Sequence, residues 1–369
     1  MPSRAPARDL AIYHERTRTR GVNPIVYWIV RAVLQPFMMV YFRVTRIGRE
    51  HVPKDGGVLL APNHRSFLDP FVIGICVRRP AYFMAKQELF DNRLQAWFLN
   101  SLGAFPVRRG EADEETMKTA RMLLERGESV LVFPEGTRIR KGSLGKPKRG
   151  VGRLALETGA PVVPIALTGT ENARRGWKVR PAKVKVRLGR PLTFPRVESP
   201  SPRLAAEVTA RIWPCVELQW EWLGGLPPLR RAAVIGDGEP IAEPLEKAGL
   251  TVDVVAPGED VALSGYDLAV FAVPAAELPA AVAAHGESIP PRAGVLVLAE
   301  GEVPPLGTQP VPYVAERTNA RAVAALGGLG DSPVLEAHDR AFARQLREVF
   351  RGTRPKVREA VGATSRSAA

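Results

Sequence analysis

The stretch LLAPNHRSFLDPF, residues 59–71, decides the fold of the first part of this chain. Its apolar run ends at Pro62, and Asn63, His64 and Asp69 follow before apolar residues resume. An aspartate followed by a proline is typical of the first turn of a helix. The pattern therefore predicts a buried strand, a short polar loop and then a helix. In α/β sheets such a junction lies at the edge where ligands bind.

His64 and Asp69 suit proton transfer at this junction. Histidine is the side chain whose ordinary pKa best fits proton abstraction near neutral pH. A carboxylate beside it can fix the tautomer of the ring and stabilise the imidazolium that forms. The alternative is structural, with Asp69 capping the helix and His64 packed beside it. The spacing of these two residues alone leaves both interpretations open.

Strand-like and helix-like segments alternate on both sides of this stretch, from about residue 56 to residue 195. Apolar, β-branched runs predict strands, and runs with helical spacing predict helices. The strands are expected at 57–62, 80–85, 130–133, 161–169 and 182–192, and the helices at 69–77, 113–129 and 151–159. This succession predicts an α/β fold with a mixed sheet layered with helices.

The charge of the chain is unevenly distributed. The 369 residues carry a net charge of +14. Residues 1–228 hold 38 Lys and Arg against 20 Asp and Glu, whereas residues 229–369 hold 14 against 18. The basic part therefore favours an anionic partner, such as a phospholipid surface, a phosphorylated substrate or nucleic acid. The two cysteines, Cys76 and Cys215, lie far apart in apolar contexts, and the five histidines are scattered, so no disulfide framework and no metal site are expected.

The N-terminal part is a basic arm, residues 1–24, followed by the most hydrophobic segment, residues 25–43. No secretory signal is evident in the arm. Arg31, Gln35 and Pro36 interrupt the apolar segment, which therefore falls short of a spanning helix. We expect it to lie in a membrane interface. The alternative is a buried helical hairpin broken at Pro36.

Four sequence blocks together resemble the glycerolipid acyltransferase family, of which 1-acylglycerol-3-phosphate acyltransferases are typical. They are N-H-x-x-x-x-D at Asn63 to Asp69, G-x-F-P-V-x-R at Gly103 to Arg109, F-P-E-G-T-R at Phe133 to Arg138, and V-P-hydrophobic at Val163 to Leu167. The resemblance covers roughly residues 20–225. It implies transfer of a fatty acyl chain from acyl-CoA or acyl carrier protein to a 1-acylglycerol-3-phosphate, giving phosphatidate in phospholipid biosynthesis. Another glycerolipid or lyso-lipid acceptor, or a non-catalytic membrane-surface scaffold, is the alternative.

The resemblance also assigns roles to residues. His64 is expected to be the general base and Asp69 the group that orients it. The acceptor phosphate site is expected to comprise Glu135, Gly136, Thr137, Arg138, Arg108 and Arg109, with Asn63, Lys86 and Lys148 as supporting residues. Arginine suits phosphate because its planar guanidinium donates two parallel hydrogen bonds. The alternative for each of these Lys and Arg residues is a solvated surface charge with no role in binding.

The acyltransferase domain is expected at residues 25–228 and ends at the Pro227-Pro228 hinge, and residues 229–352 are expected to form a second α/β unit. The segments of this unit between about residues 231 and 350 resemble the N-terminal domain of NAD-dependent glycerol-3-phosphate dehydrogenases, which has a Rossmann-like fold. Gly236 and Gly238 fit the glycine fingerprint of dinucleotide sites, but Ile241 replaces its third glycine. Asp253, at the end of the second expected strand, is a candidate for a ribose hydroxyl. We expect this domain to have no cofactor and to serve regulation or interaction with a protein partner.

The tail, residues 353–369, is expected to be disordered. Peripheral attachment to the cytoplasmic face of the cell membrane is the expected location, with an anionic phospholipid surface as partner. Nucleic acid binding is not expected, because no helix-turn-helix, RNP-like or zinc-finger pattern is present.

Overall fold

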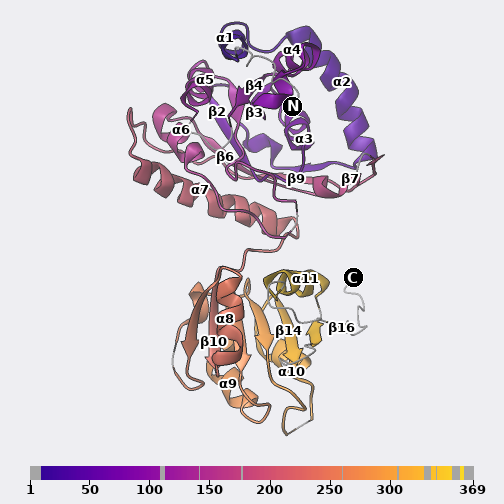
Figure 1. Cartoon of the computed structure of the whole chain (residues 1–369), viewed down its shortest axis with the longest axis vertical. Helices are drawn as coiled ribbons and strands as arrows, with labels where there is room; N and C mark the ends of the chain where they lie inside the picture. Colours follow the sequence, from indigo (N-terminus) through magenta and orange to yellow (C-terminus); the bar gives the residue numbers. More distant parts are fainter. Residues whose placement is uncertain are drawn as a thin grey trace, which may run out of the picture. The chain divides into compact units, whose positions relative to one another are not determined.

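The computed structural model describes residues 10–108, 113–140, 142–175, 178–259, 261–305, 307–327, 334–337 and 339–350, and the backbone of 358–360. The chain divides into two compact units, Met1–Gly225 and Leu226–Ala369. Each unit is built on its own seven-stranded sheet (Figure 1). The α/β class expected from the sequence is therefore confirmed for both.

The first sheet is mixed. All neighbouring strands are parallel except β6 and β9, which are antiparallel. The strands, in spatial order, are β1 (Thr45–Ile47), β9 (Lys185–Leu188), β6 (Val162–Thr168), β2 (Val58–Pro62), β5 (Ser129–Leu131), β3 (Ala81–Lys86) and β4 (Ala104–Val107). The carboxyl ends of β2, β5, β3, β4 and β6 therefore meet at one edge of the sheet, which is where α/β proteins bind ligands.

Helices bury both faces of this sheet (Figure 1). The β2 side chains alternate between two cores, with Leu60 in one and Leu59 and Ala61 in the other. One face packs against α2 (Pro24–Tyr41), α3 (Asp69–Cys76) and α4 (Arg93–Ser101), and the other against α5 (Glu114–Glu125), α6 (Gly150–Thr158) and α7 (Pro202–Trp222). A strand buried on both faces reads as a continuous apolar run, which is how β2 was found in the sequence.

The described part of the basic arm is folded. Residues Ala11–Thr19 form α1, which packs on α5 and β4. His14 is only 4% exposed and hydrogen-bonds Thr119 at 2.9 Å. The arm therefore belongs to the first unit from residue 10 onward, and residues 1–9 lie outside the described residues.

Helix α2 runs without a break through Pro36, so the alternative of a buried hairpin broken at this proline is wrong. Pro36 lies on the exposed side, where the carbonyl that loses its partner is not buried. By length and composition α2 is sufficient to cross a membrane, but a single helix of this kind near the N-terminus does not establish a span.

The second unit is a doubly wound α/β fold. Its strands lie in the order β11 (Thr251–Val255), β10 (Arg231–Gly236), β12 (Leu268–Ala272), β13 (Gly294–Val297), β14 (Ala322–Gly327), β15 (Val334–Ala337) and β16 (Arg358–Ala360). The first five are parallel. Helices α9 (Leu278–His285) and α10 (Pro310–Arg317) cover one face, and α8 (Glu239–Lys247) and α11 (Arg340–Val349) cover the other.

Two expectations for this unit need correction. Asp253 lies in the middle of β11 and not at its end. Its carboxylate forms an ion pair with Arg231 at 2.9 Å. Arg231 is the first residue of β10, whereas the glycine turn begins at Gly236, the last residue of this strand. In the tail, Arg358–Ala360 pair with β15 and so form a strand instead of disordered chain, while the rest of residues 353–369 lie outside the described residues.

Candidate active site

His64 and Asp69 form a hydrogen-bonded pair at the carboxyl end of β2. His64 Nδ1 lies 2.7 Å from Asp69 Oδ2, and the two residues are 6% and 0% exposed. The His64 ring also stacks on Phe133, with 3.8 Å between ring centroids. With Nδ1–H donated to Asp69, the lone pair of the ring lies on Nε2. This is the arrangement of an oriented general base.

Local hydrogen bonds fix the loop that carries this pair. Asn63 exchanges two hydrogen bonds with the backbone of Leu167 in β6, so its side chain extends the ladder one step beyond β2. Asp69 Oδ2 also accepts from the backbone N–H groups of Arg65 and Ser66, at 2.6 and 2.7 Å. Asp69 is the first residue of α3, and no side chain caps this helix at its N-cap position, Leu68. The carboxylate therefore holds the turn before the helix together with the His64 ring, and the alternative in which Asp69 caps the helix is wrong.

The 133–148 loop, which contains F-P-E-G-T-R, is tied to the same turn. The buried carboxylate of Glu135 accepts from the backbone N–H groups of His64 and Gly145, at 2.5 and 2.7 Å. Burial raises the pKa of this carboxyl group, although both hydrogen bonds oppose that shift. Arg65, 2% exposed, donates to the carbonyls of Ile139 and Gly142. Glu135 therefore braces the loop from within and is not among the residues that line the cavity.

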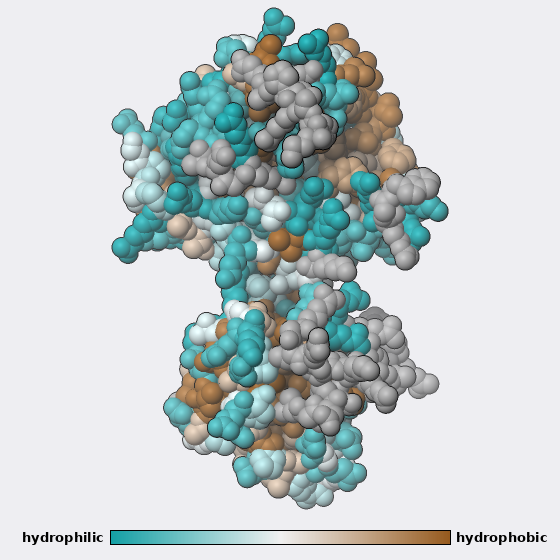
Figure 2. Space-filling view, in the orientation of Figure 1, coloured by the Kyte–Doolittle hydropathy of each residue, from teal (hydrophilic) through white to brown (hydrophobic). Residues whose placement is uncertain are grey.

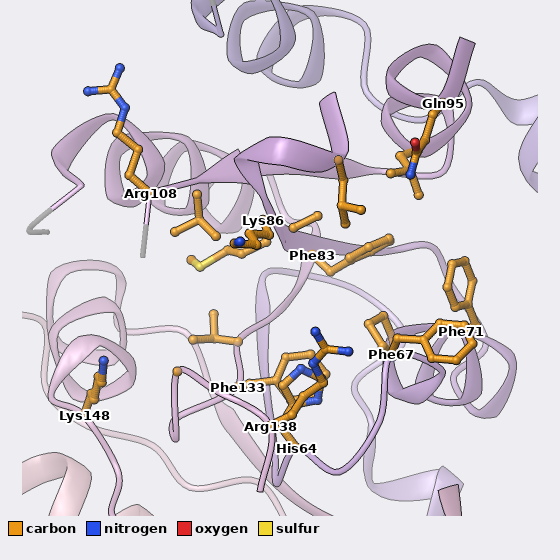
Figure 3. A pocket seen from close by; sticks show the side chains of 18 of the residues that line it. His64, Phe67, Phe71, Phe83, Lys86, Gln95, Arg108, Phe133, Arg138 and Lys148 are labelled. Carbon is orange, nitrogen blue, oxygen red and sulfur yellow. The ribbon is translucent and has the colours of Figure 1, made fainter. Parts of the chain in front are cut away.

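His64 opens onto a cavity of about 620 Å³ (Figure 3). Its apolar lining includes Phe67, Phe71, Phe83 and Leu99. Its cations are Lys86, Arg108, Arg138, Lys148 and Arg174. Figure 3 shows Arg108 and Lys148 on one side of the cavity and Phe71 and Gln95 on the other, and Arg138 and His64 both line it. The cavity therefore combines cations and apolar side chains around one histidine.

Gly136 explains how the loop brings cations to the cavity. Its φ is +65°, in the left-handed region that favours glycine. A Cβ atom here would lie 3.1 to 3.2 Å from the Cδ, Cε and Nζ atoms of Lys148, whose side chain crosses the glycine. Thr137, expected in the phosphate site, is exposed and does not line the cavity.

The remaining expected residues are placed as follows. Lys86 ends β3 and forms an ion pair with Glu88 at 2.7 Å. Arg108 follows β4, and its backbone N–H donates to Asp113. Arg109 lies outside the described residues. In the described part of the chain no group of three or more His, Cys, Asp or Glu residues could hold a metal ion.

Sequence reasoning missed Arg65, Thr170 and Arg174. Thr170 and Arg174 follow β6, and the Arg174 guanidinium lies over the ring of Phe67, 5.4 Å from its centroid. Thr170 Oγ1 donates to Asp69 Oδ1 at 2.6 Å. Their position in the sequence could have identified Thr170 and Arg174 as site residues. Both follow a buried strand parallel to β2, and they therefore lie at the ligand-binding edge of the sheet.

Comparisons with known proteins place the first unit. A family model described as "Acyltransferase" matches residues 43–168. The 1-acyl-sn-glycerol-3-phosphate acyltransferase of Bacillus subtilis (strain 168) is 36% identical over 146 residues, which are 39% of this chain and 71% of that protein. The chain belongs to the acyltransferase family. The prediction that it is an enzyme of acyl transfer is thereby confirmed.

Other relatives of this acyltransferase are matched over less of their length. The 1-acyl-sn-glycerol-3-phosphate acyltransferase of Pseudomonas aeruginosa is 32% identical over 168 residues, 44% of this chain and 63% of its own. The chloroplastic enzyme LPAT1 of Arabidopsis thaliana is 33% identical over 133 residues, and the chain covers only 37% of it.

Two solved structures resemble parts of the acyltransferase. The 1-acyl-sn-glycerophosphate (LPA) acyltransferase PlsC from Thermotoga maritima is 24% identical, with a TM-score of 0.41, over 57% of this chain and 94% of its own. The glycerol-3-phosphate dehydrogenase of Coxiella burnetii is 15% identical, with a TM-score of 0.31, over 36% of this chain and 54% of its own.

Proposed function

We propose that this acyltransferase moves a fatty acyl group from acyl-CoA or acyl carrier protein to the free hydroxyl of a 1-acylglycerol-3-phosphate. The product is phosphatidate, an intermediate of phospholipid biosynthesis. The observation that carries the proposal is the His64–Asp69 pair at the wall of a cavity lined by both cations and apolar side chains. An acceptor of this kind has a phosphate for the cations and an acyl chain for the apolar region.

The reaction needs no covalent enzyme intermediate. His64 Nε2 takes the proton of the acceptor hydroxyl while its oxygen attacks the thioester carbonyl. The new C–O bond forms, the C–S bond breaks, and the thiolate takes the proton back from the imidazolium. Asp69 remains ionised and stabilises the imidazolium in between. General base catalysis of this kind is typically worth about 10² to 10⁴ in rate.

The cations around the cavity suit the phosphate of the acceptor. Arg138, which lines the same cavity as His64, can offer two parallel hydrogen bonds to a phosphate. Lys148 is brought in over Gly136, and Lys86 and Arg108 end the neighbouring strands. We assign Arg174 to the same set of phosphate-binding cations, because it lines the same cavity, where its guanidinium lies over the ring of Phe67.

A membrane surface is the proposed place of work, at the cytoplasmic face. Every exposed residue of α2 is apolar, including Ile25, Ile29, Val33 and Val40 at 60 to 77% exposure. Figure 2 shows hydrophobic residues gathered over this region. The charge that interrupts the segment, Arg31, is turned inward, where it caps α3 by donating to the carbonyls of Gly74, Ile75 and Val77. The outer face of α2 is therefore free of charge, which suits an interfacial element.

We propose that the second unit binds no dinucleotide and that the enzyme uses acyl-CoA as co-substrate with no other cofactor. Asp253 is held by Arg231, and a hydrogen bond from that guanidinium is the first cause that lowers its pKa. Asp237 lies within the glycine turn, between Gly236 and Gly238, and places negative charge where a pyrophosphate would lie. A regulatory or protein-binding role for this unit remains our proposal.

An acyl-transfer assay with a panel of acceptors tests the proposed function. Purified protein is given oleoyl-CoA and palmitoyl-CoA with lysophosphatidate, glycerol-3-phosphate, lysophosphatidylcholine or monoacylglycerol. We expect lysophosphatidate to be the preferred acceptor. Arg138→Ala and Arg174→Ala should raise its KM by about tenfold or more, because each removes a charge-assisted hydrogen bond. Arg180→Ala, on an exposed residue outside the cavity lining, is the matched control. Preference for a phosphate-free acceptor would contradict the proposal.

A further inference from the structure

The two oxygens of the Asp69 carboxylate have different partners. Oδ2 is shared by His64 Nδ1 and two backbone N–H groups, whereas Oδ1 accepts a hydrogen bond from Thr170 Oγ1 at 2.6 Å. Asp69 and Thr170 are both 0% exposed. Bulk solvent is therefore excluded from the carboxylate, and the threonine hydroxyl donates a hydrogen bond to Oδ1.

The backbone delivers Thr170 to this position in a specific way. β6 ends at Thr168, and Gly169 turns the chain with φ +92°. A Cβ atom at Gly169 would lie 2.0 Å from the carbonyl oxygen of Lys183, so only glycine allows the turn. Thr170 then begins a short 3₁₀ helix, Thr170–Asn172, with its side chain directed at Asp69. The contact joins elements 101 residues apart in sequence.

We propose that Thr170 is a positioning residue for acyl transfer, which holds the Asp69 carboxylate in the orientation that the His64 ring needs. The hydrogen bond fixes the plane of the carboxylate, so that Oδ2 faces Nδ1. It also takes up part of the negative charge, which limits how strongly Asp69 holds a proton on the imidazole. His64 thereby stays available as a base. This inference rests on the proposed function, in which His64 takes the proton of the acceptor.

Other charged groups lie around the His64–Asp69 pair and also affect its electrostatics. Arg65 and Glu135 face it from the turn after β2 and from the 133–148 loop. Glu171, next to Thr170, is largely buried, and burial is the main cause that raises the pKa of its carboxyl group, against the opposing effects of backbone hydrogen bonds and of Arg65. Arg138 lines the cavity onto which His64 opens. None of these is altered by a change of the Thr170 hydroxyl alone.

The test compares Thr170→Val, which removes the hydroxyl at similar volume, with Thr170→Ser, which keeps it. We expect Thr170→Val to lower kcat by about 10- to 100-fold, the value of one hydrogen bond to a buried charge. The KM values of both substrates should stay within about twofold, since no contact with substrate is lost. The acid limb of the kcat–pH profile should move to higher pH in Thr170→Val only, because Asp69 then holds the proton on His64 more strongly.

Two kinetic results would overturn the inference. One is a kcat of Thr170→Val within about twofold of the wild type. The other is an equal loss in both variants with an unmoved acid limb, which would indicate a structural role alone.

A measurement without substrate keeps this inference separate from the proposed function. NMR of histidine-labelled protein follows the Nδ1 proton of His64, assigned by its loss in His64→Ala. Its low-field signal should persist in Thr170→Ser and shift or broaden in Thr170→Val. An unchanged signal in Thr170→Val would refute the role of Thr170. If the wild type transferred no acyl group to any acceptor, the proposed function would fail, yet this signal would still decide whether Thr170 positions Asp69.

Discussion

The guanidinium of Arg65 lies over the indole ring of Trp220, with its Cζ atom 4.3 Å from the ring centroid. Arg65 follows His64 directly, and Trp220 lies near the end of α7. The same guanidinium donates to the carbonyls of Ile139 and Gly142. One buried arginine thus joins the catalytic turn, the 133–148 loop and α7.

This junction predicts the effect of Arg65→Lys. A lysine has no planar fork, so it cannot serve both carbonyls while stacked on the indole. We expect the KM of the acceptor to rise by about tenfold, since the 133–148 loop loses its brace. Steady-state kinetics with the acceptor varied measure this, and Trp220→Phe, which keeps an aromatic ring, should have the smaller effect. A reduced thermal stability with an unchanged acceptor KM would contradict the prediction.

Gly136→Ala should disturb the cationic lining of the cavity at Lys148. The new methyl group would meet the Lys148 side chain at 3.1 Å, and the left-handed backbone adds about 1 kcal/mol of strain. Gly56→Ala is a matched control, because Gly56 has φ +76° but nothing lies within 4 Å of its added Cβ. We expect similar losses of unfolding free energy in both variants and a raised acceptor KM in Gly136→Ala alone. Equal KM values in the two variants would refute the role of this glycine.

His14 predicts that the first unit loses stability in acid. Desolvation by burial is the largest cause that lowers the pKa of His14 from its ordinary value of 6.5, although Glu115 and Asp113 oppose it. A histidine with a lowered pKa in the folded state stabilises the fold above pH 6.5, and this contribution is lost as the pH falls below that value.

Urea unfolding followed by tryptophan fluorescence measures this effect. All six tryptophans precede residue 226, so the signal reports the first unit. His14→Leu should unfold with a weaker dependence on pH between about 5 and 7 than the wild type. A parallel pH dependence in the two proteins would show that His14 does not contribute.

Fold and site were predictable to different degrees. β2, α3 and β6 were evident because their apolar runs are bounded by Pro, Gly and Asp residues. The carboxyl end of β2 also located the His64–Asp69 pair. Helix α7 was not evident, since Pro214 interrupts its pattern, yet the helix passes through it.

The remaining site residues depend on tertiary contacts. Glu135 was expected at the phosphate, but its carboxylate bonds backbone N–H groups that come from residues 64 and 145. Arg65 in sequence is an ordinary arginine next to a histidine, and only Trp220 and the 133–148 loop give it a role. Contacts between residues that are far apart in sequence produce no local sequence pattern, so these roles could not be predicted from the sequence.

The exposed apolar face of α2 predicts attachment to membranes, and replacing its apolar residues with polar ones should weaken that attachment. Ile29 and Val33 lie one turn apart and are 60% and 68% exposed. Transfer of each into lipid is worth about 1.5–3 kcal/mol, so Ile29→Ser with Val33→Ser should reduce binding to vesicles by at least about tenfold. Cosedimentation with vesicles of phosphatidylethanolamine and phosphatidylglycerol measures the bound fraction. Leu218→Ser, at a 51% exposed leucine of α7, should bind like the wild type. Equal losses in all variants would contradict a specific role of α2.

The turnover of His64→Ala tests the central claim most directly. The account predicts a loss of about 10² to 10⁴ in kcat with lysophosphatidate and oleoyl-CoA, because the variant has no base for the acceptor hydroxyl. Its tryptophan-detected unfolding should show that the first unit is still folded. A folded His64→Ala enzyme with the turnover of the wild type would contradict the account.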